Sequence, residues 1–195
     1  NYTSDEGVLY TKDHSHLIAY PSAKNAAGNY RIPEGTSAID DNAFENAQVS
    51  TVTMPSTLRT IGAQAFLHSD LTQLTLPDGL RSAGTWAFAY TTNLTSVDLG
   101  GITALPDGAF IGSSSLTDVN FRPDLAALTT IGEDAFNWTS LTSATLPDTV
   151  TTIADDAFAN NKSLTSLHLG AGVTSIGATA LGGTPSLAAL SVSPA

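Results

Sequence analysis

The sequence predicts an α/β repeat solenoid, in which stacked repeats form a parallel sheet on one face and short helical turns on the other. The first observation is a phenylalanine, preceded by alanine, that recurs every 22 to 26 residues. The second is an apolar or small residue five positions before it, and the third is an L-x-x-L-x-L phrase that begins five or six residues after it. Self-similarity at such a period is the signature of repeat architectures. The repeated positions are Phe44, Phe66, Phe88, Phe110, Phe136 and Phe158, with Leu181 in the last copy.

The L-x-x-L-x-L phrase predicts one strand in each repeat. Residues two apart in a strand face the same side, so we expect Leu74 and Leu76 to point inward and Thr75 outward. One such strand cannot bury its apolar face alone, so neighbouring repeats have to stack and close a common core. A period of 20 to 29 residues with this phrase is the leucine-rich-repeat signature. We therefore predict a right-handed leucine-rich-repeat solenoid with about seven repeats of 22–26 residues.

Each repeat is expected to contain the same elements in the same order. Residues 141–158 show a strand, a turn at Pro147, a second short extended run near Ile153 and a tight helical turn that ends at Phe158. The loop between the two extended runs is three residues longer between Phe121 and Ile131. Insertions in solenoids map to loops on one face, which is often a binding face. Loops are also where changes of length are tolerated, so both interpretations remain open.

The first 28 residues do not fit the repeat. Residues 8–10 and 17–20 are β-rich runs on either side of a polar stretch, which predicts a β-hairpin. Because terminal repeats expose core unless they are capped, we interpret residues 1–28 as an N-terminal β-hairpin and cap, and residues 29–195 as the solenoid of the same structural domain. The sequence stops just after a core strand, from which we expect a segment of a longer protein.

Composition limits the classes of partner. The chain has 18 acidic and 7 basic residues and a net charge of −11. This argues against nucleic acid and anionic membrane surfaces, because both require patches of Lys and Arg. With no cysteine, disulfides, iron–sulfur clusters and cysteine zinc sites are excluded. No run approaches the ~18 apolar residues of a transmembrane helix, so no membrane insertion is expected for this segment.

Several phrases carry a family resemblance. IPEGTSAIDDNAF, LPDTVTTIADDAF and MPSTLRTIGAQAF are similar to the I-P-x-x-V-x-x-I-G-x-x-A-F phrase of BspA-like leucine-rich repeats, and EGVLYTKDHSHLIAYP resembles a hairpin that often precedes them. The resemblance covers essentially the whole chain. It implies a bacterial cell-surface or secreted protein that adheres to a host extracellular-matrix protein, a cell-surface protein or a glycan. It implies no catalytic residues and no cofactor.

One departure from the BspA-like pattern concerns the third residue after each phenylalanine. Relatives often place an inward Cys or Asn there, whereas this chain has mostly small residues, so a continuous buried ladder of Asn or Cys is not expected. The residues in this slot are Ala47, Ser69, Thr91, Ser113, Thr139, Asn161 and Thr184.

The polar strand positions between core leucines are candidate binding residues, because they should line the open face of the sheet. The distinctive members of this face are Asp98, Asp118, Asn120, Arg122 and His168. The alternative is a solvated face without a ligand. Interface cores favour Tyr, Trp and Arg, and their scarcity on this face favours that alternative.

Three aromatic residues form a second candidate site. Trp86, Tyr90 and Trp138 occupy slots two residues before or after a phenylalanine, where other repeats have mostly polar residues or glycine. This predicts exposure on the helical-turn side, and if the turn is helical, Trp86 and Tyr90 share a face at i, i+4. Exposed aromatics are candidate contacts with a protein or a sugar. The alternative is that they lie flat over a neighbouring repeat and are partly buried.

Acidic pairs recur at one phase of the repeat. Carboxylates could bind Ca²⁺, but we interpret them as caps at the N-termini of the helical turns. Only His14 and His16 are histidines close in sequence, and no metal site is expected. No metal-ligand, phosphate-binding or nucleophile motif is present, nor is a carboxylate pair marked for glycoside hydrolysis. The acidic pairs are Asp40-Asp41, Glu133-Asp134 and Asp155-Asp156.

We therefore predict a non-catalytic recognition or adhesion module, monomeric, located outside the cell or on its surface, without a cofactor or a metal. The alternative is a structural spacer that projects another domain and has no ligand of its own.

Overall fold

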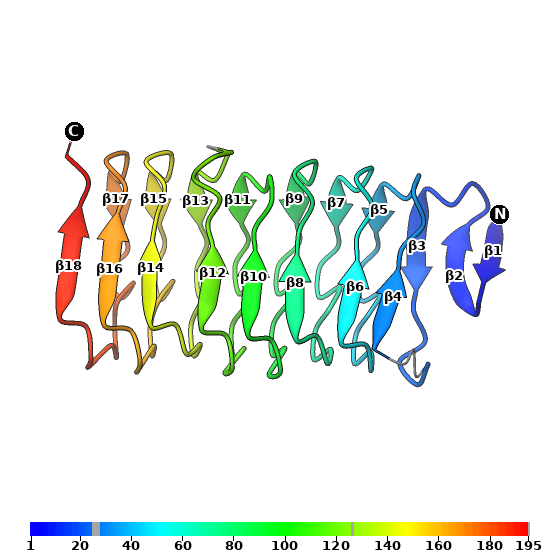
Figure 1. Ribbon diagram of the computed structural model, residues 1–195, viewed down its shortest axis with the longest axis horizontal. Coiled ribbons are helices and arrows are strands. Elements are labelled where there is room, and N and C mark those ends of the chain that lie inside the picture. Colours follow the sequence, from blue (N-terminus) through cyan, green and yellow to red (C-terminus); the bar gives the residue numbers. More distant parts are fainter. Residues whose placement is uncertain (25–27, 126, 195) are drawn as a thin grey trace.

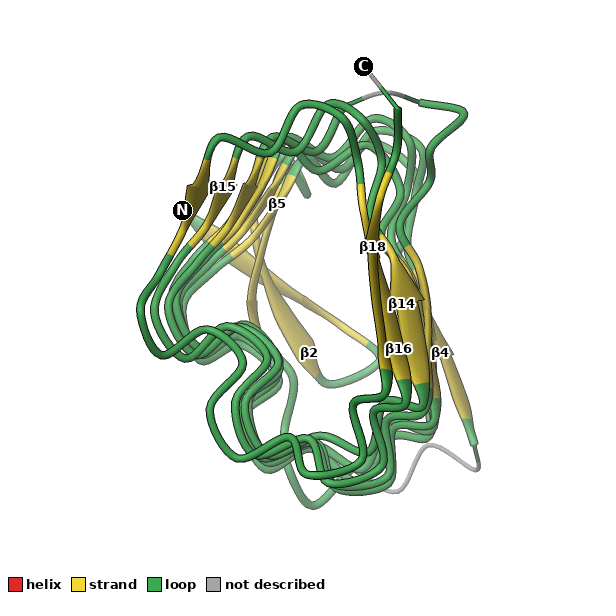
Figure 2. Cartoon of the chain, turned by 90° about the vertical axis from the view of Figure 1, so that its left-hand side faces the viewer, coloured by secondary structure: helices red, strands yellow, loops and turns green. Residues whose placement is uncertain are grey.

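The computed structural model describes residues 1–24, 28–125 and 127–194. They form one solenoid in which each repeat adds a layer along a single long axis (Figure 1). Viewed along that axis, two columns of strands lie on opposite sides of the cross-section and are connected by loops (Figure 2). The solenoid is of the right-handed type and has about eight turns, one more than the sequence predicts.

The first column contains the strands that the leucine phrase predicts. Neighbouring strands pair in parallel and in register, so that Val97 lies opposite Leu74 of the preceding repeat and Val119 of the following one. Leu74 and Leu76 are buried and Thr75 is exposed, which confirms the predicted alternation. Hydrogen bonds group the strands as β4–β6, β8–β10–β12 and β14–β16–β18. They are β4 (Asn29–Arg31), β6 (Thr51–Thr53), β8 (Gln73–Thr75), β10 (Ser96–Asp98), β12 (Asp118–Asn120), β14 (Ser143–Thr145), β16 (Ser166–Leu169) and β18 (Ala189–Val192).

The second extended run of each repeat is confirmed as a column of short parallel strands. Ile39 lies opposite Ile61 in this column, and both side chains are buried. The strands are β5 (Ala38–Ile39), β7 (Thr60–Ile61), β9 (Ser82–Ala83), β11 (Ala104–Leu105), β13 (Thr130–Ile131), β15 (Thr152–Ile153) and β17 (Ser175–Ile176).

The predicted helical turns are wrong, and the fold is all-β rather than α/β. Figure 2 shows no helix in the part of the chain that the structure describes, and none there could span a membrane. The residues two before and two after each phenylalanine have left-handed backbone; Asn42 and Asn46, for example, have φ of 57 and 55°. A right-handed helix requires negative φ throughout, so these residues interrupt it. The same conformation occurs at Gln64, His68, Trp86, Tyr90, Gly108, Gly112, Asp134, Trp138, Asp156 and Asn160.

The backbone hydrogen bonds give the energetic reason for this turn. The N–H groups of Asn42, Phe44 and Asn46 donate to carbonyls of the next repeat at 2.7 to 3.0 Å. The N–H groups between them donate to carbonyls three residues earlier. Half of the donors that a helix would use internally therefore join neighbouring repeats, as in a parallel ladder.

The core is organised around a stack of phenylalanine rings. Successive rings are nearly parallel, with centroids 4.6 to 5.6 Å apart, close to the spacing of strands in a sheet. The rings are fully buried, so each phenylalanine is covered by the repeats on both sides. The stacked residues are Phe44, Phe66, Phe88, Phe110, Phe136 and Phe158.

The slot three residues after each phenylalanine holds a broken row of buried polar groups. Thr91 Oγ1 donates to the carbonyl of Phe88 at 2.8 Å and lies 2.9 Å from Ser113 Oγ. Asn161 Nδ2 donates to three backbone carbonyls, two from its own repeat and one from the preceding repeat. Ser69 Oγ, by contrast, is buried and has no hydrogen-bond partner within the described residues. The row is thus partly hydrogen-bonded and partly unpaired.

The N-terminal hairpin is confirmed and is longer than predicted. β2 (Val8–Thr11) and β3 (His16–Ala19) pair antiparallel, and β1 (Tyr2–Asp5) adds a further antiparallel strand to β2. β3 also pairs in parallel with β5, so the hairpin continues the short-strand column. The ring of Tyr20 stacks on Phe44 with centroids 4.9 Å apart, and the hairpin covers this end of the core. At the other end, Leu190 and Val192 of β18 are more than half exposed.

Candidate functional site

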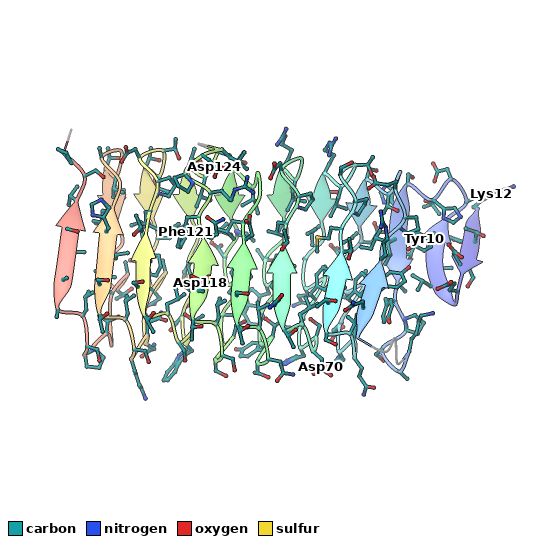
Figure 3. The ribbon with its side chains drawn as sticks, in the orientation of Figure 1. Tyr10, Lys12, Asp70, Asp118, Phe121 and Asp124 are labelled. Carbon is teal, nitrogen blue, oxygen red and sulfur yellow. The ribbon has the colours of Figure 1, made fainter. Side chains whose placement is uncertain are left out.

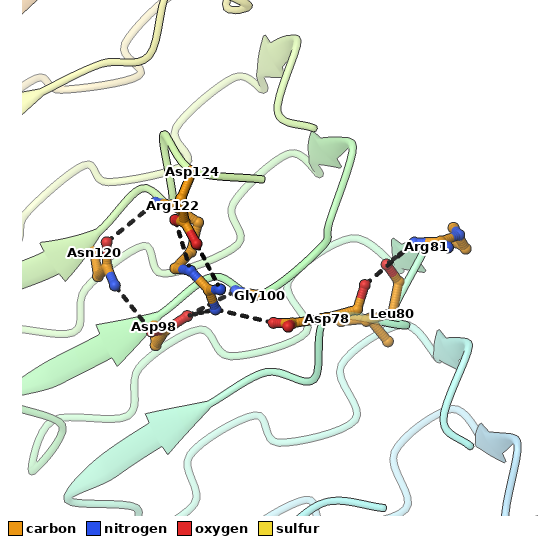
Figure 4. A network of polar contacts seen from close by, with 8 residues as sticks. All are labelled: Asp78, Leu80, Arg81, Asp98, Gly100, Asn120, Arg122 and Asp124. Atoms are coloured by element: carbon orange, nitrogen blue, oxygen red, sulfur yellow. Dashed lines mark hydrogen bonds and ion pairs between the residues drawn. The ribbon is translucent and has the colours of Figure 1, made fainter. Parts of the chain in front are cut away.

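Three of the predicted sheet-face residues meet at one edge of the sheet. Asp98 ends β10 and Asn120 ends β12, and the two lie opposite each other in the parallel register. Arg122 follows at the start of the predicted insertion, where its φ of 50° directs the chain away from the strand. Because parallel strands end at the same edge, the three side chains gather there (Figure 4).

Arg122 is the centre of a network of ion pairs. Its Nη1 lies 2.9 Å from Asp78 Oδ1 and 3.2 Å from Asp98 Oδ1. Its Nε and Nη2 each donate to Asp124 at 3.0 Å, which forms the bidentate arrangement that a guanidinium favours. Asn120 Nδ2 donates to the remaining oxygen of Asp98 at 2.9 Å. One arginine therefore joins three successive repeats and the insertion (Figure 4).

The electrostatics of the network indicate a structural role. The hydrogen bonds from Arg122 lower the pKa of Asp124, and those to Asp124 first and Asp98 second raise the pKa of Arg122. Asp98 also accepts the backbone N–H of Gly100 at 2.9 Å, so both of its oxygens are bonded. Asp98, Asn120 and Arg122 thus use their polar groups on one another, which favours the solvated-face alternative for this part of the sheet.

The structure does not bring the other two sheet-face candidates to this network. Asp118 is exposed and begins β12, whereas Asp124 lies in the loop beyond the end of that strand (Figure 3). His168 lies on β16, and its ring nitrogens are 2.8 and 3.0 Å from the hydroxyls of Ser191 and Ser193 in the next repeat. The five residues therefore form no single site.

The aromatic residues lie on the turn side, as predicted, but without a helix. The rings of Trp86 and Tyr90 meet edge to face with centroids 6.2 Å apart, and Trp86 is 40% exposed. A Cβ on Gly108 would lie 2.5 Å from Trp86 Cδ1, and one on Gly112 would collide with the ring of Tyr90. Both rings therefore lie over glycines of the next repeat. Tyr90 also stacks on His68 at 5.1 Å.

Trp138 has a separate position on the same side. Its side chain is 51% exposed, and Lys162 Nζ lies 5.6 Å from the ring centroid, within cation–π range. A shallow hollow of 170 Å³ adjoins the ring and is lined by hydroxyl and amide groups as well as Lys162. Tyr90, Gly112 and Trp138 hold the same slot in successive repeats, so the two aromatic positions are about 10 Å apart, or two strand spacings.

Comparison with known proteins identifies the repeat. A family model for the BspA type leucine rich repeat region matches residues 23–129 and 129–194, in 6 copies. The chain belongs to the BspA-type leucine-rich-repeat family. No curated protein matches the chain.

Three solved bacterial structures resemble this BspA-type solenoid. A leucine-rich repeat protein from Eubacterium ventriosum is 24% identical with a TM-score of 0.78, over 94% of this chain and 50% of that one. The T. pallidum leucine rich repeat protein is 25% identical with a TM-score of 0.72, over 91% and 82%. A leucine-rich repeat protein from Bacteroides ovatus is 22% identical with a TM-score of 0.64, over 89% and 51%. The chain spans about half the length of the first and third of these proteins.

The acidic pairs of the BspA-type repeats do not cap helices, so that prediction is wrong. In the first pair, Asp41 Oδ1 accepts the N–H of Ala63 in the next repeat at 2.7 Å. Asp107, a single acidic residue at the same phase of its repeat, accepts the N–H of Glu133 at 2.9 Å. These carboxylates therefore join consecutive repeats. Within the residues that the structure describes, no group of three His, Cys, Asp or Glu side chains is placed to hold a metal ion.

Sequence reasoning missed several residues of these two regions. Asp78 and Asp124 complete the Arg122 network, and Lys162 covers Trp138. The signal for Asp124 was present, because it lies two residues after Arg122 in the insertion. Asp78 and Lys162 carry no such signal, since polar residues are common at their slots in the other repeats.

Proposed function

We propose that this solenoid is a non-catalytic recognition module of a bacterial cell-surface or secreted protein, and that it binds a protein or glycan of a host matrix or of another cell. The turn face is the proposed binding surface. The observation that carries the proposal is the exposure of Trp86 and Trp138, at 40 and 51%, on a backbone fixed by inter-repeat hydrogen bonds. Exposed tryptophans on a rigid surface supply apolar area and an N–H donor at little entropic cost.

The alternative surface is less suitable. A ligand that used Asp98, Asn120 or Arg122 would have to replace the hydrogen bonds that these residues make to one another. Breaking paired, partly buried charges costs free energy that the new contacts must first recover. Trp86 and Trp138 are 40 and 51% exposed, and a ligand could contact either ring without breaking an ion pair of the described chain.

The test is binding of the protein to immobilised fibronectin, fibrinogen, collagen and a glycan array. We expect saturable binding to at least one of these surfaces, weakened at least ~10-fold by Trp86→Ala or Trp138→Ala, as for an interface hot spot. Asp118→Ala is the matched control, because Asp118 is exposed on β12 in the first strand column, outside the turns, and makes no ion pair with the described residues. Binding that is lost in Asp118→Ala and retained in both tryptophan variants would place the site on the sheet instead.

A structural spacer is the second candidate function. The rod-like stack of repeats in Figure 1 and the self-contained Arg122 network both favour it. It predicts no saturable binding to any of these surfaces and a monomer in sedimentation at all concentrations. The family and fold are those of repeat proteins that are generally non-catalytic, and we propose no reaction for this chain.

A further inference from the structure

The cap strands and the first short strands form one sheet, in the order β1-β2-β3-β5-β7-β9. A groove crosses the outer face of this sheet. It consists of two adjoining hollows of 490 and 700 Å³ that share His16, Ile18 and Asp40. The first extends over β5 and β7 as far as Gly62, and the second extends over β1 and β2 to Tyr2. The groove is on a different part of the molecule from the turn-face aromatics and shares no residue with them.

The groove is shallow, and its shape follows from the order of large and small side chains across the strands. Ala38 lies opposite His16 on one side and Thr60 on the other, so the floor is low between two taller residues. Gly62 continues this floor, because a Cβ there would collide with the backbone N and Oδ1 of Asp41. Tyr2, at 67% exposure, forms the far wall.

Three carboxylates along the groove each bind the protein through one oxygen. Asp13 accepts three hydrogen bonds at Oδ1 from its own turn, and Asp40 Oδ1 lies 2.9 Å from Nδ1 of His16. Asp41 accepts the N–H of Ala63 at Oδ1. The Oδ2 atom of each makes no hydrogen bond to the described part of the chain. These contacts hold the three carboxylates in place and leave one oxygen of each for a ligand.

The charge of the groove points to a cationic ligand. Hydrogen bonds from Thr11 first and Ser15 second lower the pKa of Asp13 to about 2, so this carboxylate is ionised at physiological pH. Among the described lining residues, Lys12 is the one lysine or arginine, and it projects outward at the end of the cap (Figure 3). No three metal-ligating side chains converge among the described residues, so spaced cations on a chain fit better than one metal ion.

An extended peptide can place several cations along one groove. Residues two apart in an extended chain face the same side about 6.6 Å apart, so alternate cationic side chains can follow the two hollows from Asp13 past Asp40 to Asp41. An arginine can also lie over the ring of Tyr2, because guanidinium groups stack on aromatic faces. We propose that this groove binds an extended protein segment with alternating Arg or Lys residues, whose cations pair with Asp13, Asp40 and Asp41.

The test uses a fluorescently labelled Arg-Thr-Arg-Thr-Arg peptide, with a peptide that carries citrulline in place of each arginine as the uncharged control. The groove variant combines Asp13→Asn, Asp40→Asn and Asp41→Asn, which keeps each acceptor oxygen and removes each charge. The matched variant combines Asp70→Asn, Asp107→Asn and Asp118→Asn, which changes the net charge equally. Asp107 is a close match for Asp41, because its Oδ1 also accepts an N–H of the next repeat.

We expect one peptide to bind per protein, at least ~10-fold weaker binding to the groove variant and less than ~2-fold weaker binding to the matched variant. The citrulline peptide should not bind, and Trp86→Ala should leave the affinity unchanged, which separates this groove from the turn-face site. Equal weakening in both triple variants would mean general attraction to an acidic protein and would overturn the proposal. Absence of binding to the unaltered protein, with circular dichroism showing an intact fold, would overturn it too.

Discussion

The indole of Trp86 lies where a side chain on Gly108 would be, because a Cβ on Gly108 would come within 2.5 Å of Trp86 Cδ1. The two residues hold the same slot in successive repeats, and both have left-handed backbone, with φ of 59 and 62°. The display of a large ring in one repeat therefore depends on the absence of a side chain in the next. In the same way, a Cβ on Gly112 would collide with the ring of Tyr90.

This relationship predicts the effect of Gly108→Ala. The left-handed backbone should cost about 1–2 kcal/mol of the free energy of unfolding, and the new Cβ should push the indole of Trp86 outward. The chain has 2 tryptophans, so in a Trp138→Phe background the fluorescence reports Trp86 alone. We expect its emission to shift to longer wavelength.

Gly35→Ala is the control for Gly108→Ala. Gly35 also has positive φ, at 97°, but a Cβ there would meet nothing within 4 Å. It should lower stability and leave the emission of Trp86 unchanged. If Gly108→Ala also leaves the emission unchanged, the indole does not rest on the glycine.

The core could be predicted from the sequence because it depends on local spacing. Alternation within a strand determines that Leu74 and Leu76 share a face, and the constant five-residue spacing fixes Ile39 relative to Phe44. Stacking then needs no further information, since each repeat can bury its apolar face only against another copy.

The helical turns were predicted wrongly because the two left-handed slots were interpreted from their exposure alone. Asn42, Asn46, Gly108 and Gly112 are residue types that tolerate positive φ, and their recurrence around the phenylalanine was a signal for turns. Contacts between side chains of different repeats cannot be predicted from local spacing in this way. Arg122 reaches Asp78, 44 residues earlier, and only the stacking of the repeats brings them together.

Asn161→Ala tests the buried polar row. The amide donates to the carbonyls of Phe136, Phe158 and Ala159. The first and last of these also accept Thr139 Oγ1 and the N–H of Trp138, so the substitution leaves the buried carbonyl of Phe158 without a donor in the described chain. At about 1–3 kcal/mol for a buried polar group left unsatisfied, we expect a loss of about 1–3 kcal/mol in the free energy of unfolding. Urea titration followed by circular dichroism measures it.

Ser69→Ala is the matched variant in the same slot of an earlier repeat. Because Ser69 Oγ is buried without a partner in the described chain, its removal should be neutral or stabilise the protein by up to about 1 kcal/mol. A large destabilisation by Ser69→Ala would show that a buried water or a rotated hydroxyl satisfies this group.

Arg122→Gln should increase local opening at the sheet edge formed by Asp98 and Asn120 and in the inserted loop after Phe121, while the core stays folded. Without the guanidinium, Asp78, Asp98 and Asp124 repel one another around one point. We expect faster amide hydrogen exchange at Gly100, whose N–H binds Asp98, with unchanged exchange at the buried core residue Phe44. Raising the salt from about 50 to about 500 mM should reduce the difference between variant and unaltered protein. Equal exchange in both proteins at low salt would contradict a role for the network in holding this edge.

A buried tyrosine pair between the cap and the first repeat should make the stability of the protein fall at alkaline pH. Tyr10 and Tyr30 are 0 and 8% exposed, and their hydroxyls lie 2.6 Å apart. Burial first raises the pKa of both, and the hydrogen bond to Tyr10 raises that of Tyr30 further. The folded state therefore keeps two protons that the unfolded state releases near its pKa of about 10. The stabilisation is complete below about pH 10 and is lost as the pH rises above it, by about 1.4 kcal/mol per pH unit for each retained proton.

A variant with Tyr10→Phe and Tyr30→Phe separates this pair from the other titrating groups. Removing both hydroxyls leaves neither partner unsatisfied, so stability near pH 8 should change by no more than about 1 kcal/mol. Between about pH 9 and 11, denaturant titrations should show the free energy of unfolding falling more steeply for the unaltered protein than for the variant. Because the lysines and arginines are the same in both chains, the difference in slope belongs to the pair. Parallel curves would mean that the two hydroxyls ionise as readily in the folded cap as in the unfolded chain.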